Sequence, residues 1–65
     1  MSEELEAAQR YRVHAEQLRA IAADTADDNS RDMLLQIADD YDRMALSLQS
    51  IDRTNKVLRA RAPSQ

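Results

Sequence analysis

LLQIADDYDRMALSL, residues 34–48, is the stretch that decides the fold of this 65-residue chain. Small and large apolar residues return in it at alternating intervals of four and three positions. That spacing is typical of a helix that packs one face against another helix. The residues of this face, which we call the seam, are Leu34, Ala38, Tyr41, Ala45 and Leu48. The stretch therefore predicts one arm of a helical pair.

The first part of the chain carries a second seam with the same spacing. Its residues are Ala8, Tyr11, Ala15, Leu18, Ala22 and Thr25. Between the two seams lies ADDNS, residues 26–30, in which four residues favour turns and helix starts. The chain has no glycine, and its single proline is Pro63, so little else interrupts a helix.

These features predict an all-α fold, an antiparallel helical hairpin that forms one domain over residues 1–65. We expect a helix over about residues 3–25, a turn over 26–30, a second helix over about 31–60 and a frayed tail over 61–65. Any of residues 27–30 could be the N-cap of the second helix, and Asp28 or Ser30 is favoured.

Side-chain volume predicts the register of the hairpin. If Ala15 faces Tyr41 and Ala38 faces Leu18, each layer combines one alanine with one large residue. A register with Ala15 on Ala38 would leave alternate layers hollow, which close packing disfavours. Beyond Ile51 the seam turns polar, so we expect the intramolecular core to end there.

Two helices of this length form a small core, which must offset about 1.5 kcal/mol of conformational entropy for each ordered residue. With no cysteine and one histidine, neither disulfides nor a structural zinc site can reinforce the fold. Oligomerisation can reinforce the fold. We therefore expect a homodimer with coiled-coil-like packing, a four-helix bundle. Apolar residues to one side of the seams form the predicted dimer interface: Ile21, Ile37, Met44 and Ile51.

Composition also limits the classes of partner. A net charge of −3 argues against sequence-independent binding of nucleic acid. The longest uninterrupted apolar run is residues 20–23, and the start MSEELEAAQR carries acids where a secretory signal would carry bases. We therefore expect a cytoplasmic protein without a membrane partner.

Few side chains suggest chemistry. Asp39 and Asp40 are adjacent on a helix and point about 100° apart, so they cannot close on one metal ion with Asp42. We expect a solvated acidic face in which Asp39 pairs with Arg43. The single histidine, His14, excludes a zinc site with paired histidines and should lie near the Tyr41 hydroxyl. We expect no metal, no cofactor and no enzymatic activity.

The chain resembles the short, uncharacterised two-helix proteins that occur in many copies in alphaproteobacteria. The resemblance covers about residues 11–45. The matching positions are Tyr11-Arg12, Ala15-Glu16, Leu18-Arg19, Ile21-Ala22, Arg31, Leu34-Leu35, Ile37-Ala38, Tyr41 and Met44-Ala45. In architecture alone the predicted hairpin is similar to Rop, a dimeric four-helix bundle that binds RNA with the outer faces of its first helices.

Two functions follow as expectations. The first is a small self-associating interaction or scaffolding module with an unknown protein partner. The alternative, implied by the similarity to Rop, is an RNA-binding regulator that would use Arg12 and Arg19 on the first helix. That surface also carries Glu16 and Val13, so its charge is mixed.

Overall fold

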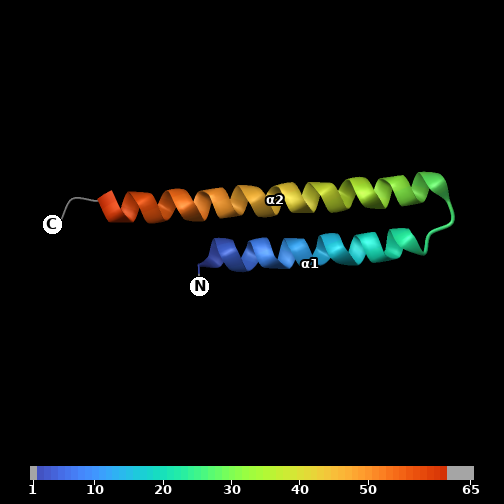
Figure 1. Ribbon diagram of the computed structural model, residues 1–65, viewed down its shortest axis with the longest axis horizontal. Helices are drawn as coiled ribbons and strands as arrows, with labels where there is room; N and C mark the ends of the chain where they lie inside the picture. Colours follow the sequence, from blue (N-terminus) through green and yellow to red (C-terminus); the bar gives the residue numbers. More distant parts are fainter. Residues whose placement is uncertain (1, 62–65) are drawn as a thin grey trace.

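The computed structural model describes residues 2–61. It contains helix α1 (Glu3–Ala23) and helix α2 (Asp28–Arg61), which lie side by side and run in opposite directions (Figure 1). The predicted all-α helical hairpin is therefore confirmed. Pro63 and most of the predicted tail lie outside the described residues.

The start of α1 is stabilised by a side-chain cap. The Ser2 hydroxyl accepts a hydrogen bond of 3.1 Å from the Leu5 backbone N–H, which would otherwise have no partner within the helix. Three glutamates occupy the first turn, where the partial positive charge of the helix end favours anions. The helix ends at Ala23, two residues before the sequence predicted.

The start of α2 differs from the prediction. Neither Asp28 nor Ser30 is the cap: the Asp27 carboxylate accepts a hydrogen bond of 2.8 Å from the Ser30 backbone N–H. The Asp27 carbonyl also accepts the first helical bond, from Arg31. Asp28 instead lies in the first turn and pairs with Arg31 at 2.7 Å. The helix consequently begins three residues earlier than expected, because Asp27 caps it.

Alanine forms the buried centre of the hairpin. Five alanines are at most 1% exposed: Ala8, Ala15, Ala22, Ala38 and Ala45. The described part of the chain buries no large side chain completely. The hairpin measures 60 × 17 × 9 Å, so it is one helix thick, and large seam residues remain partly open to solvent on its broad sides.

Contacts of Tyr41 bear on the register. The centroid of its ring lies 5.6 Å from the ring centroids of both Tyr11 and His14. His14 precedes Ala15, the predicted neighbour of Tyr41, so these contacts support the volume-based register, which stays a prediction. The expected proximity of His14 to Tyr41 is confirmed, although the described contact is between the rings.

Packing between the two helices continues past Ile51, where the sequence predicted the end of the intramolecular core. Asp52 occupies the next seam position and is only 6% exposed, and the Asn55 amide donates a hydrogen bond of 3.2 Å to Glu4. Polar contacts thus continue the packing beyond the apolar core. Helix α2 then runs on to Arg61, past the start of α1 (Figure 1). We call residues 56–61 the overhang.

Candidate interaction surface

The two halves of the chain repeat at an offset of 30 residues. Tyr11, Ala15, Leu18 and Ile21 correspond to Tyr41, Ala45, Leu48 and Ile51, and each pair has the same degree of burial. The two antiparallel helices are thus related by an approximate two-fold axis perpendicular to the plane of the hairpin. Equivalent positions on α1 and α2 therefore project from the same broad side.

The apolar face is one of these broad sides. It comprises the four residues predicted to form the dimer interface: Ile21, Ile37, Met44 and Ile51. Each directly precedes a buried seam residue, so the hairpin brings all four to the same side. Their exposed fractions are 54%, 38%, 41% and 49%. They are large apolar side chains in contact with solvent, and they share this side with Ala7 and His14, which directly precede Ala8 and Ala15.

The opposite broad side, the charged face, carries the residues that directly follow a large seam residue. Arg12, Arg19, Asp42 and Gln49 are among them and are partly buried, whereas Leu35, which follows Leu34, is 38% exposed. The Arg19 guanidinium reaches across the hairpin to Asp42 at 2.6 Å and to Asp39 at 3.0 Å. Hydrogen bonds to Asp42 and then Asp39 raise the pKa of Arg19. Among the described residues, the ion pairs that join the two helices therefore lie on this side.

The ion pairs correct one prediction. Asp39 does not pair with Arg43 but with Arg19 on the other helix, and Arg43 lies 3.6 Å from Asp40. Spacing within one helix predicts Arg43 as the partner of Asp39, whereas the observed partner, Arg19, comes from α1. The predicted RNA-contact residue Arg19 is held between two carboxylates. No ion pair to Arg12 is found among the described residues.

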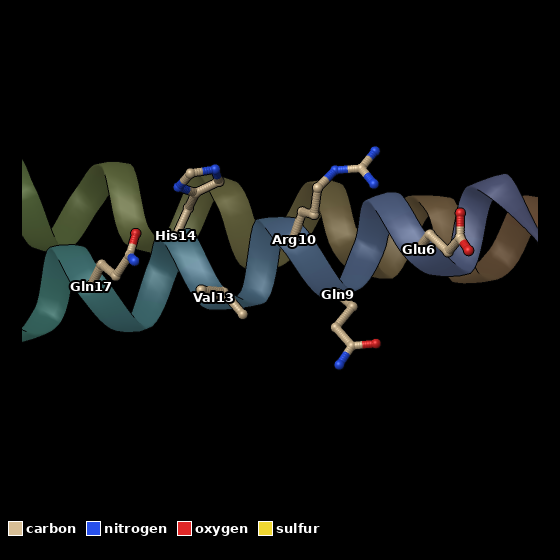
Figure 2. A pocket seen from close by; sticks show the side chains of 6 residues that line it. All are labelled: Glu6, Gln9, Arg10, Val13, His14 and Gln17. Atoms are coloured by element: carbon tan, nitrogen blue, oxygen red, sulfur yellow. The ribbon is translucent and has the colours of Figure 1, made fainter.

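A shallow depression lies on the surface of α1 (Figure 2). Its lining residues are Glu6, Gln9, Arg10, Val13, His14 and Gln17. All come from one helix, so no second element closes the depression, and Gln9 points away from the side on which Arg10 and His14 project (Figure 2). The surface is open and offers no enclosed place for a substrate.

Within residues 2–61, no group of three histidine, cysteine or acidic side chains could hold a metal ion. Neither helix of this described part is apolar enough over a sufficient length to cross a lipid bilayer.

A buried carboxylate marks the open end of the hairpin. Asp52 stands where the 30-residue repeat has Ala22, and Lys56 lies 3.1 Å from its carboxylate. The pKa of Asp52 is lowered, mainly by a hydrogen bond from the Ser2 hydroxyl and further by Lys56, against the opposing effect of burial. The same hydroxyl caps α1, so Asp52 ties the start of α1 to α2.

Acid is expected to destabilise the hairpin partly through Asp52. Because its pKa is lower in the folded state than the usual value of about 3.9, its contribution is present at neutral pH. That contribution is lost as the pH falls below about 4 and through the lowered folded-state pKa. Thermal unfolding followed by circular dichroism between pH 7 and pH 2 should show a smaller loss of Tm for Asp52→Asn than for the wild type.

Two further variants sharpen this comparison. The pKa of Asp27 is also lowered, by the Ser30 backbone N–H, so Asp52→Asn should keep part of the acid sensitivity and Asp27→Asn with Asp52→Asn should keep less. Asp40→Asn, at an exposed position, is the matched control and should behave as the wild type does. Equal losses of Tm for Asp52→Asn and the wild type would contradict the role of Asp52.

The sequence identified the residues of the apolar face, but it missed the ion pairs of the charged face and the buried position of Asp52. Extending the repeat would have marked Asp52, which lies seven residues after Ala45. The same step of seven from Ile51 leads to Leu58 in the overhang, which is 60% exposed.

Comparison with protein-family models, curated proteins and solved structures finds no match to the chain. The resemblance to the alphaproteobacterial two-helix proteins stays a prediction.

Proposed function

We propose that this hairpin is a small self-associating module that acts in interaction or scaffolding, without catalysis. Two copies would bring their apolar faces together and form a four-helix bundle. The surface that remains outside such a dimer would meet a protein partner, which the residues do not identify.

One observation carries this proposal: large apolar side chains on the apolar face are as exposed as charged side chains on the charged face. Ile37 and Met44 are 38% and 41% exposed, and the side chains of Arg19 and Asp42 are each 40% exposed. Soluble monomers seldom expose several large apolar side chains on one side in this way. The hairpin also completely buries no large side chain within residues 2–61, so a second layer of helices would supply the missing core.

Sedimentation equilibrium at micromolar concentration tests the proposal. We expect a species of twice the chain mass of 7.4 kDa, with the helical circular dichroism of the hairpin. Dilution should lower the thermal midpoint, because the folded state is linked to association. A monomer of 7.4 kDa that keeps its full helicity would contradict self-association.

The RNA-binding alternative makes a different prediction. It needs Arg12 and Arg19 to be available to phosphates, but Arg19 is bound by two carboxylates of α2. We therefore expect no binding to structured RNA at physiological salt in a filter-binding series over a range of salt concentrations. Binding that falls steeply with salt, and that Arg12→Ala with Arg19→Ala abolishes, would favour the regulator instead.

A further inference from the structure

Helix α2 has opposite charges in its two halves. Residues 28–44 contain five acids and two bases, whereas residues 45–61 contain one acid and four bases. The helix therefore has a net charge of −3 in its first half and +3 in its second. Asp39 and Asp42 are paired with Arg19 on the charged face, so the complementarity open to a second copy is between the acidic turn and the basic overhang. Antiparallel α2 helices bring these oppositely charged ends together, and parallel ones place like charges together at both ends.

The apolar row of α2 is centred on the same point. Met44 lies seven residues from both Ile37 and Ile51, and the midpoint of α2 (Asp28–Arg61) falls between residues 44 and 45. Antiparallel α2 helices would therefore match over their full length. Met44 would face Met44, and Ile37 of each copy would face Ile51 of the other.

We propose that two hairpins associate through their apolar faces with α2 antiparallel to α2 of the second copy and with the turns at opposite ends. This inference rests on the proposed self-association and specifies its geometry. The two-fold axis passes near Met44. The overhang of each copy then lies along the acidic turn of the other, where Arg59 and Arg61 approach Asp24 and Asp27 of the second copy.

The competing arrangement has both turns at the same end. It would place α2 over α1 of the second copy, so the overhang would extend beyond that shorter helix and leave Leu58 and Val57 in solvent, where they are 60% and 46% exposed in the hairpin. It would also gather the acids of both turns at one end. In the opposite-end arrangement, Glu4 approaches Asp24 of the second copy, a like-charged contact at an exposed rim where solvent and salt screen it.

Distances between labels decide between the arrangements. The chain has no cysteine, so Asn29→Cys and Ala60→Cys each provide one spin-label site near an end of α2. The two positions are 31 residues apart, or about 46 Å along a helix. Pulsed electron paramagnetic resonance on the Ala60→Cys dimer should give a separation of at least about 46 Å in the opposite-end arrangement. A mixture of the two variants also forms dimers with one label at position 60 and one at position 29 of the other copy. These dimers should add a population of label-to-label distances within about 20 Å, the width of two packed helices.

The outcomes separate this inference from the proposed function. A short distance in the Ala60→Cys dimer, without a short population in the mixed sample, would establish a dimer with both turns at one end and overturn the inference alone. A monomer in sedimentation equilibrium for the unlabelled wild type would overturn self-association and the inference together.

Reversing a charge in the overhang gives a second test, because the two arrangements predict opposite changes in the strength of self-association. Arg61→Glu should weaken self-association about fivefold in the opposite-end dimer, because the dimer contains the contact with the acidic turn twice. In the same-end dimer it would relieve repulsion between basic ends and would not weaken association. Arg43→Glu makes the same change of charge at an exposed position near the middle of α2, and should have a smaller effect. Association at least as tight for Arg61→Glu as for the wild type would overturn the opposite-end arrangement.

Discussion

Met44→Lys is expected to weaken self-association about a hundredfold, which corresponds to about 2.8 kcal/mol. The side chain of Met44 is 41% exposed in the hairpin and lies in the centre of the apolar face. In the proposed dimer it is covered by the second copy, so the substitution would bury two lysine ammonium groups close together without partners. Sedimentation equilibrium at several concentrations measures the effect.

The matched control is Leu46→Lys. Leu46 is also a large apolar residue of α2 and is more exposed, at 64%, but it lies outside the apolar face. It should leave the dissociation constant within about twofold of the wild type, as surface substitutions typically change free energies by at most about 0.5 kcal/mol. Equal weakening by the two substitutions would show that the contact is not confined to the apolar face.

Enlarging a buried alanine is expected to destabilise the hairpin itself. Ala15 and Ala38 are both 0% exposed, and each occupies the narrow space between the two helices. A leucine at either position would force the helices apart, and overpacking of this kind typically costs about 1 to 3 kcal/mol. Urea unfolding of Ala15→Leu and Ala38→Leu, at a protein concentration that keeps the wild type associated, gives the change in the free energy of unfolding.

Gln9→Leu provides the comparison for these variants, because Gln9 is exposed on α1 and the substitution adds an apolar side chain outside the seam. It should change the free energy of unfolding by no more than about 0.5 kcal/mol. If Ala15→Leu and Ala38→Leu were as harmless as Gln9→Leu, close contact of the helices along the alanines would be wrong.

The sequence predicted the hairpin because its seams repeat over several turns and because no glycine or internal proline interrupts them. Ala38 and Tyr41, for example, have the burial that their place in the pattern predicts. The boundaries were predicted less well, because four consecutive residues could each cap α2. The choice of Asp27 depends on where the chain leaves α1, and the Thr25 hydroxyl helps to set that point by donating to the Ile21 carbonyl at 2.7 Å.

Contacts between the helices were the part that sequence reasoning could not reach. Pairing Asp39 with Arg43 follows from spacing within one helix, but the long side chain of Arg19 reaches Asp39 and Asp42 from the other helix. The spacing of Asp52 marks it as a seam residue, yet its polarity suggested the end of the core. Lys56 lies four residues further along the same helix, but Ser2 comes from the start of α1 and reaches Asp52 only in the folded hairpin.

The alanine seam alone does not fix a single alignment of the two helices. Buried residues return every seven positions on both helices, so sliding α1 along α2 by seven residues would again oppose alanines and large residues, with little change in shape. The polar contacts do not share this degeneracy. A slide of about 10 Å would separate Asp52 from Ser2 and Arg19 from Asp42, leaving the Asp52 carboxylate without the start of α1. These few charged side chains therefore select one alignment from several that the apolar residues would accept.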